Sequence, residues 1–279
     1  MRQPIRLATC LALIAAVCAP TAPAWSSTAD PGAGTGTTKD SAKASAATAK
    51  KTEKTKKAQQ VDCAKVKCIA LTFDDGPGKR VGALLDTLKK HNVKATFFLE
   101  GQYVKARPEL AKRIAKEGHQ LGNHSYRHPD FTKSKESEIK SEIVRTQELV
   151  HKLTGKYPTT LRPPYGLYND QVQEVAKELG LPIVLWNTAS HDWASRDQKA
   201  IYREVLKGAR RDSVVLMHDW VDATVDVMPR LLTALKKKGF HVVTVDTLVR
   251  GRTKLQPGEV WPEDATIDSS DSPLVPYQH

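Results

Sequence analysis

Short apolar runs alternate with amphipathic helical patterns between Cys68 and Val249, and this alternation constrains the fold more than any other feature of the chain. Runs of strand length are predicted at residues 69–73, 95–99, 120–122, 160–162, 183–186, 214–217 and 241–243. Helical patterns lie at residues 82–90, 108–116, 136–153, 170–179, 199–207 and 225–238. Such alternation predicts an α/β fold with a parallel sheet, either open and doubly wound or closed into a barrel.

Two adjacent acids, Asp74 and Asp75, follow the first apolar run and precede a Gly-Pro turn. This is how a buried strand ends with its carboxylates exposed at the mouth of a barrel or the edge of a sheet. One carboxylate at such a position can bind a metal while its neighbour acts as a base. A plain surface turn is the alternative interpretation.

His124 and His128 stand four residues apart downstream of the acidic pair. If this segment is one helical turn, both imidazoles project from the same face. Two histidines with one carboxylate form a three-ligand set that leaves positions open for water, as in a catalytic zinc site. A pair of surface histidines is the alternative, but the acidic strand end in the same chain favours the metal site.

Five motifs in family order resemble those of the polysaccharide deacetylases with a NodB homology domain, carbohydrate esterase family 4. The resemblance covers roughly residues 67–249. The motifs are Thr72-Phe73-Asp74-Asp75-Gly76-Pro77, His124-Ser125-Tyr126-Arg127-His128, Arg162-Pro163-Pro164-Tyr165-Gly166, Asp192-Trp193 and Leu216-Met217-His218-Asp219. The resemblance implies a distorted (β/α)7 TIM-like barrel in a single domain. The motifs follow predicted strands, which suits the C-terminal mouth of a barrel.

The resemblance implies that Asp75, His124 and His128 bind a divalent metal. Two imidazoles and a carboxylate suit zinc, and cobalt or nickel would also fit. Such a metal lowers the pKa of its water and polarises the acetyl carbonyl.

The family pattern also assigns roles on the base side of the site. Asp74 is expected to be the general base, and an adjacent metal would favour its ionised form. Arg162 resembles the arginine that holds this aspartate, with a surface charge before a Pro-Pro turn as the alternative. The Tyr165 N–H resembles the oxyanion donor, and it is the first N–H after two prolines that have none.

His218 resembles the general acid that protonates the leaving amine, a role suited to histidine near neutral pH. Asp192 is expected beside His218, where it would favour the charged imidazole. Two departures from the family pattern bear on Asp192. Thr188 or Ser190 stands where related sequences often carry another acid, and the adjacent His191 could compete for Asp192.

Two apolar residues of the motifs are expected to shape the substrate site. By resemblance, Leu216 lines a pocket for the acetyl methyl group and Trp193 forms a wall of the groove. An ordinary strand residue and a core tryptophan are equally good interpretations.

The N-terminus is typical of an exported protein. Residues 1–24 combine Arg2 and Arg6, a short apolar core and a small-residue cleavage site, which predict a signal peptide. Residues 25–60 are rich in Ala, Ser, Thr, Gly and Lys and predict a disordered cationic linker. The deacetylase-like domain is predicted at 61–250, followed by a loosely ordered C-terminal tail at 251–279.

Cys63 and Cys68 remain after removal of the signal peptide. An even pair of cysteines in an exported protein is usually oxidised, so a Cys63–Cys68 disulfide is expected. Half of a metal site is the alternative, but no second cysteine pair is present in the mature sequence.

The formal net charge of +12 bears on the partners of the protein. Its lysines are spread over the linker and helix faces without a stripe of stacking aromatics, which argues against nucleic acid. An exported basic protein more plausibly meets an anionic cell wall. We expect a secreted monomer with no membrane span after signal cleavage and with possible wall association.

The function implied by this resemblance is that of a hydrolase of non-peptide amide bonds. Its substrate would be an acetylated polysaccharide with N-acetylglucosamine units, as in peptidoglycan or chitin. An acetylxylan esterase shares the same motifs and is the first alternative. An inactive glycan-binding protein is the second, although loss of Asp74 or His218 would mark such a protein and both are present.

Overall fold

The computed structural model describes residues 61–250 and 254–266, which belong to one compact unit. The predicted signal peptide and linker lie outside the described residues, as do positions 251–253 and 267–279. No helix within the described ranges combines the length and apolar character that a membrane span requires.

All strand pairings in the described residues are parallel. The strands are β1 (Cys68–Gly76), β2 (Thr96–Leu99), β3 (Gln120–Asn123), β4 (Ile183–Val184), β5 (Thr188–Ala189), β6 (Ser213–His218), β7 (His241–Val243) and β8 (Val260–Trp261). The main sheet has the order β3-β2-β1-β6-β5, and β7 pairs with the first residues of β1.

Single bridges close this sheet into a ring. Leu161 forms parallel bridges to Asn123 of β3 and to Ile183 of β4. The edges of the main sheet are β3 and β5, and β5 follows β4 after three residues. The bridges from Leu161 to β3 and β4 therefore connect the two edges. The expected distorted (β/α)7 barrel is therefore confirmed, and the open doubly wound sheet is excluded.

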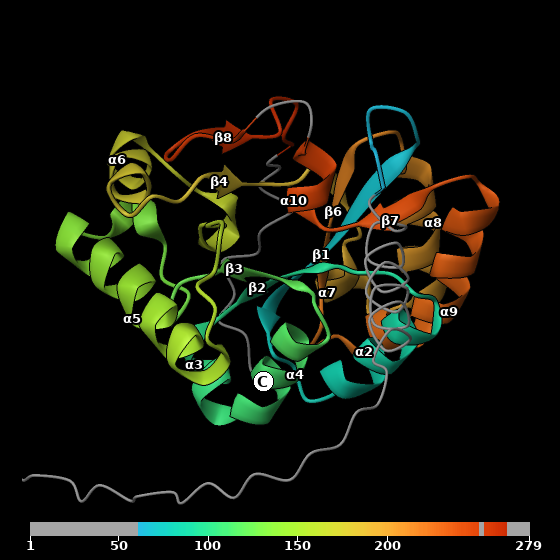
Figure 1. The fold of residues 1–279 in the computed structure, drawn as a ribbon, viewed down its shortest axis with the longest axis horizontal. Helices are drawn as coiled ribbons and strands as arrows, with labels where there is room; N and C mark the ends of the chain where they lie inside the picture. The colour runs from blue at the N-terminus through green and yellow to red at the C-terminus, as the bar shows by residue number, and fades with distance from the viewer. Residues whose placement is uncertain (1–60, 251–253, 267–279) are drawn as a thin grey trace, which may run out of the picture. The chain divides into compact units, whose positions relative to one another are not determined.

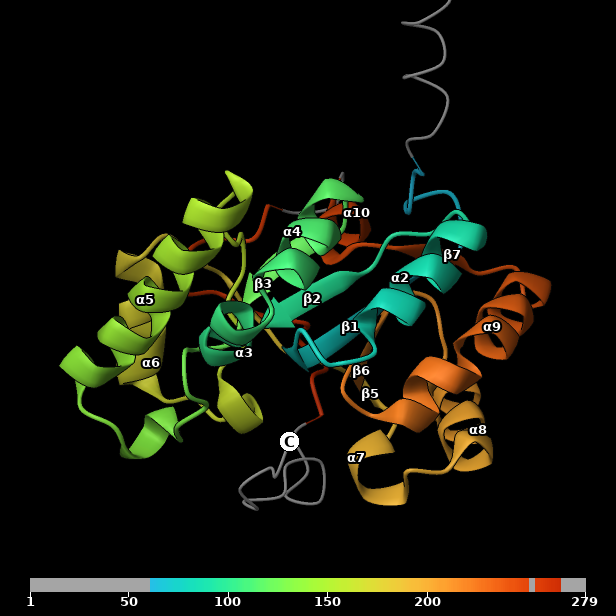
Figure 2. The ribbon, with the colours of Figure 1, turned by 90° about the horizontal axis from the view of Figure 1, so that it is seen from below.

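Helices surround the strands, with α5 and α6 on one side and α8 and α9 on the other (Figures 1 and 2). The helices are α2 (Val81–Lys90), α3 (Gly101–Ala106), α4 (Pro108–Lys116), α5 (Glu136–Thr154), α6 (Asp170–Glu178), α7 (Asp192–Ser195), α8 (Gln198–Gly208), α9 (Asp222–Lys237) and α10 (Val245–Val249), with 3-10 turns at Phe131–Lys133 and Pro164–Gly166. Every predicted helix is present. The short α3, α7 and α10 were not predicted, because so few residues establish no helical period.

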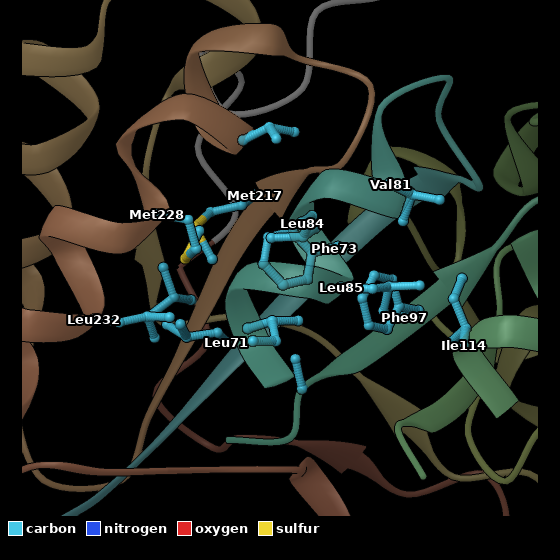
Figure 3. Close-up of a cluster of buried hydrophobic side chains, with 14 of the residues drawn as sticks. Leu71, Phe73, Val81, Leu84, Leu85, Phe97, Ile114, Met217, Met228 and Leu232 are labelled. Carbon is cyan, nitrogen blue, oxygen red and sulfur yellow. The ribbon is translucent and has the colours of Figure 1, made fainter. Parts of the chain in front are cut away.

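Alternate residues of β1 separate two layers of the core. Leu71 and Phe73 pack outward against the helices, in a cluster that β2, β6, α2, α4 and α9 complete (Figure 3). Ala70 belongs to the second cluster, with Phe98, Leu161 and other strand residues. This two-residue period is that of a strand with both faces buried. Burial of each large apolar side chain contributes roughly 1.5–3 kcal/mol to stability.

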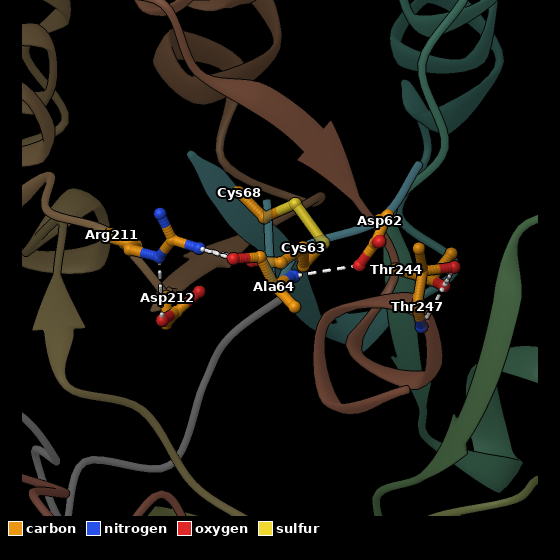
Figure 4. The surroundings of a disulfide bond; sticks show 8 residues. All are labelled: Asp62, Cys63, Ala64, Cys68, Arg211, Asp212, Thr244 and Thr247. Carbon is orange, nitrogen blue, oxygen red and sulfur yellow. Dashed lines mark hydrogen bonds and ion pairs between the residues drawn. A yellow bond between two sulfur atoms is a disulfide. The ribbon is translucent and has the colours of Figure 1, made fainter. Parts of the chain in front are cut away.

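The predicted disulfide joins Cys63 to Cys68 at the start of β1, with the two Cα atoms 5.5 Å apart (Figure 4). Both cysteines are fully buried. Arg211 reinforces the same turn, since its guanidinium donates to the carbonyls of Cys63 and Ala64 at 2.7 Å each. The entry into β1 is thus fixed by a covalent link and by charged hydrogen bonds from the loop that precedes β6.

Three sequence-based expectations about strands are corrected. The predicted strand at 160–162 is not a regular strand, and only Leu161 forms single bridges there. The predicted strand at 183–186 stops at Val184, because the buried Arg162 side chain takes the carbonyls of Val184 and Leu185. The segment after Gly251 was expected to be loosely ordered, but within it β8 pairs with β4 (Figure 1). The Val-Trp pair of β8 was obscured by the surrounding prolines and acids.

Candidate active site

The two carboxylates that end β1 reach the same site because the backbone turns between them. Neighbouring residues of a regular strand point to opposite faces. Asp75, however, has a φ of 61°, and the register of β1 against β2 shifts between Phe73 and Gly76. Asp74 Oδ2 and Asp75 Oδ1 consequently lie 3.8 and 3.2 Å from the same His124 Nε2 atom.

The two motif histidines lie in a loop after β3, so the helical turn considered from their spacing is wrong. Ser125 and His128 have φ values of 64° and 61°. The loop is held by its own hydrogen bonds, from the Ser125 N–H to Asn123 Oδ1 and from the His128 N–H to Ser125 Oγ. This irregular turn brings the Nε2 atoms of His124 and His128 to 3.2 Å from each other.

Asp75, His124 and His128 form the one group in the described part of the chain with three potential metal ligands clustered together. The Asp75 Oδ1 atom lies 3.2 Å from His124 Nε2 and 3.4 Å from His128 Nε2. Burial raises the pKa of the Asp75 carboxyl, but His128 and the other nearby imidazoles hold it well below its usual range. The carboxylate is therefore ionised and able to bind a cation.

The donor atoms of this group fit a divalent cation. His124 Nδ1 lies 2.6 Å from the Arg162 carbonyl, which can only accept, so Nδ1 carries a proton and Nε2 is the ring atom left to bind a cation. Asp75 Oδ1 is buried without a hydrogen-bond partner. A lone pair and a buried anion that face each other at about 3 Å are stabilised by a metal ion, and the Nδ1 contact is typical of metal-ligating histidine.

Arg162 holds Asp74 from the interior of the barrel. Arg162 is fully buried, and its Nη1 donates to Asp74 Oδ1 and Thr72 Oγ1 at 2.8 Å each. Its Nε and Nη2 donate to the carbonyls of Val184 and Leu185. The guanidinium thus has a fixed position, and it leaves the Asp74 Oδ2 atom directed toward the histidines.

His218 ends β6 directly opposite Asp74 in the parallel register. Its Nδ1 lies 2.8 Å from Asp192 Oδ1, and Asp192 Oδ2 accepts the His218 backbone N–H and the Thr224 hydroxyl. Burial lowers the pKa of His218, but the Asp192 carboxylate outweighs burial and raises this pKa to about 9. His218 is therefore protonated at neutral pH. Both oxygens of Asp192 contact His218, so Asp192 pairs with His218 rather than with the adjacent His191.

Tyr165 lies beside the metal-ligand cluster in a left-handed conformation, with a φ of 60°. Its ring packs edge-on against the His128 ring at 4.5 Å between centroids. The Tyr165 backbone N–H donates to no other described residue. It is thus available to a ligand, as an oxyanion donor must be.

Leu216 and Trp193 are both buried close to His218. The Trp193 ring meets the His218 ring edge-on at 5.6 Å between centroids. Leu216 lies two residues before His218 on β6, opposite Thr72 of β1. Their positions are compatible with a wall and a floor of the site and equally with core packing.

Sequence reasoning missed two side chains next to the cluster. The Trp220 Nε1–H donates to Asp75 Oδ2 at 3.3 Å. Glu100 follows β2 and is almost fully buried, and burial together with nearby Asp75 raises its pKa to about 9. An aromatic residue two positions after His218 was a signal that could have identified Trp220, whereas nothing in the sequence around Glu100 distinguishes it from a surface acid.

A family model described as polysaccharide deacetylase matches residues 62–184. The peptidoglycan-N-acetylglucosamine deacetylase PgdA of Listeria monocytogenes is 46% identical over 210 residues, which cover 75% of this chain and 43% of that protein. The chain therefore spans less than half the length of this relative.

Two further similarities cover most of the matched proteins. The peptidoglycan-N-acetylmuramic acid deacetylase PdaA of Bacillus subtilis is 38% identical over 190 residues, which cover 66% of this chain and 72% of the relative. A solved structure described as T48 deacetylase with substrate has a TM-score of 0.70 and 39% identity, and the match covers 72% of this chain and all of that one.

Proposed function

The chain belongs to the polysaccharide deacetylase family, and from this premise we propose that it removes N-acetyl groups from N-acetylglucosamine units of peptidoglycan. One observation carries the proposal. Asp74 with its partner Arg162 and His218 with its partner Asp192 lie on adjacent strands, next to a three-ligand cluster that fits a metal. A base and an acid that both adjoin one cation site are what amide hydrolysis requires.

A divalent cation held by Asp75, His124 and His128, for which zinc is our choice, would supply Lewis acidity that acidifies water and polarises an acetyl carbonyl. Asp74 accepts a proton from the attacking water at Oδ2, while Arg162 keeps Oδ1 in place. The Tyr165 N–H donates to the carbonyl oxygen as negative charge develops there.

His218 acts on the leaving group. An amide nitrogen leaves poorly unless it is protonated, so an acid that is charged at neutral pH favours N-acetyl over O-acetyl substrates. Asp192 keeps the imidazole charged and fixes its orientation through Nδ1, which directs Nε2 to the substrate. Trp193 and Leu216 border this region and would contact the sugar and the acetyl methyl group.

The substrate and its location follow from the relatives. Two relatives are named for deacetylation of sugars in peptidoglycan, a polymer that lies outside the cytoplasmic membrane. We therefore propose that the protein is secreted through the signal peptide at 1–24 and that the lysine-rich linker at 25–60 favours contact with anionic wall polymer. We propose that the enzyme is a monomer.

Acetate release by the purified protein tests this function. Peptidoglycan, chitooligosaccharide and acetylxylan are compared, each with and without a chelator and after zinc is added back. The expected result is chelator-sensitive release from the N-acetylated glycans, with peptidoglycan preferred. Far higher efficiency on acetylxylan would assign an O-deacetylase with the same machinery, and absence of release from every substrate would leave the inactive glycan-binding protein.

A further inference from the structure

A pocket of about 330 Å³ adjoins the metal-ligand cluster and shares Asp75 with it. Its other walls come from the segment after β1, the α3–α4 junction, the end of α7 and the loop after β6. The volume lies at the lower end of the range for ligand pockets, which suits a small group rather than an oligomer. Apart from Asp75, no residue that lines this pocket has a role in the function proposed above.

Three cations from separate segments line the pocket: Lys79, Arg107 and Arg196. None of them forms an ion pair with a carboxylate of the described residues. The next residue in the chain, Arg80, differs in this respect, because it pairs with Asp222 and Asp226. Two acids also line the pocket. Asp222 pairs with Arg80, and Asp75 faces the imidazoles of the metal-ligand cluster, so the three cations leave the pocket with a positive field that favours an anion.

The arrangement of these cations leaves donors for a ligand. Arg107 Nη1 donates to the Pro77 carbonyl at 3.0 Å, which fixes the guanidinium, and the group lies 5.3 Å above the Tyr103 ring. One guanidinium edge is used in this way, and the remaining N–H groups have the fork geometry that carboxylates accept. Lys79 and Arg196 are exposed, so each can adjust to an anion at the rim.

Trp220 connects the pocket to the reaction centre. Its indole donates to Asp75, its ring lies 5.7 Å from the His218 ring, and the Arg196 guanidinium lies 5.7 Å from its centroid. An indole face beside cationic groups suits a sugar that carries an anionic substituent, because the ring contacts C–H groups while the cations meet the charge.

We propose that this pocket binds a carboxylate on the sugar next to the one that is deacetylated. In peptidoglycan that neighbour is a muramic acid unit, which presents a carboxylate either on its lactyl group or on the attached peptide. Neutral chitin presents no such group. The inference rests on the proposed function, and it adds a recognition element that discriminates between glycans with the same acetylated sugar.

The test compares three soluble tetrasaccharides in acetate release: chitotetraose, an alternating N-acetylglucosamine–N-acetylmuramic acid tetrasaccharide without peptides, and the same glycan with its peptides. The variants are Lys79→Gln, Arg107→Gln and Arg196→Gln. Lys90→Gln is the matched control, because Lys90 is an exposed cation at the opposite end of α2 from Lys79. Arg107→Lys tests whether the charge or the fork of Arg107 matters.

We expect the wild-type enzyme to have a lower KM for the carboxylate-bearing glycans than for chitotetraose. Each pocket variant should raise that KM by about 3- to 10-fold, with kcat and the KM for chitotetraose unchanged. Lys90→Gln should behave as wild type, and added salt should reduce the preference. A preference that appears only with peptides present would assign the carboxylate to the peptide.

Equal KM values for the charged and neutral glycans, or equal effects of the pocket variants on both, would overturn the proposal while the deacetylase function stands. Calorimetric binding of the same glycans to the Asp74→Asn variant gives a readout that needs no turnover. The variant could bind the charged glycan more tightly while the wild-type enzyme releases no acetate from any glycan. That result would support the proposed pocket and contradict the proposed function.

Discussion

Two buried ion pairs lie on adjacent strands of this barrel, and they have opposite polarity. In the Asp74–Arg162 pair the carboxylate faces the site and the cation lies behind it. In the His218–Asp192 pair the cation faces the site and the carboxylate lies behind it. The two supporting residues, Arg162 and Asp192, are fully buried. Arg162 also donates to two backbone carbonyls, and Asp192 also accepts from the Thr224 hydroxyl.

The contrast bears on the roles proposed above, Asp74 as the base and His218 as the acid. A buried aspartate behind His218 favours the protonated imidazole. Burial lowers the pKa of His218, but the carboxylate of Asp192, with smaller contributions from Asp75 and Asp74, raises it to about 9. The variants below change one pair at a time, and they test whether the charge of the supporting residue sets the proposed role of its partner.

His218→Ala has the largest expected effect on activity. Loss of a general acid lowers kcat by roughly 10²- to 10⁴-fold on an N-acetylated glycan. The loss should be much smaller on 4-nitrophenyl acetate, because nitrophenolate leaves without protonation. Measured rates on both substrates separate the role of His218 in acid catalysis from a general loss of structure, and near wild-type turnover on the amide would refute this role.

Arg162→Leu has the largest expected effect on stability. It leaves the buried Asp74 carboxyl group without its cationic partner, and it removes the donors to the carbonyls of Val184 and Leu185. Loss of one partner of a buried pair costs about 3–5 kcal/mol, which urea denaturation would measure. The double variant Arg162→Leu/Asp74→Leu should recover part of this loss, and a single variant with unchanged stability would contradict the interpretation.

Asp192→Asn should change the pH profile. The carboxylate raises the pKa of His218, so its removal lowers that pKa and the protonated acid is lost at a lower pH. The basic limb of kcat/KM should move toward lower pH by about one unit or more. An unchanged basic limb, in an enzyme that still releases acetate, would show that Asp192 does not set the charge of His218.

Thr224→Val has the smallest expected effect. The Thr224 hydroxyl donates to Asp192 Oδ2 at 2.6 Å, but the His218 backbone N–H donates to the same oxygen. The expected cost is about 1–2 kcal/mol in the free energy of unfolding, with kcat within about 10-fold of wild type. If Thr224→Val lowered kcat more than Asp192→Asn does, Thr224 rather than Asp192 would be the more important support of His218.

The regular elements of the fold could be predicted from the sequence, but the irregular backbone around the site could not. The long helices and β1, β2, β3, β6 and β7 were predicted because their apolar periods are regular. The convergence of Asp74 and Asp75 depends on a positive φ at a non-glycine residue, which no local pattern indicates. The break between β4 and β5 depends on a buried side chain from another strand, and such tertiary contacts are not encoded in local periodicity.

The site was predicted by family motifs more than by local structure. The motif histidines converge through a loop with left-handed residues rather than through a helical turn, so their identity was more informative than their spacing. Trp220 and Thr224 lie outside the quoted motifs, and only the folded chain places them against Asp75 and Asp192.

The central claim is that metal binding and acid–base catalysis depend on different residues of the site. Metal content and acetate release, measured on the same samples, test this claim most directly. Asp74→Asn and His128→Ala are compared with wild type on the same purified samples. We predict that Asp74→Asn retains about one metal ion per chain but loses turnover, whereas His128→Ala loses both. Stoichiometric metal in His128→Ala, or full turnover by Asp74→Asn, would contradict the account.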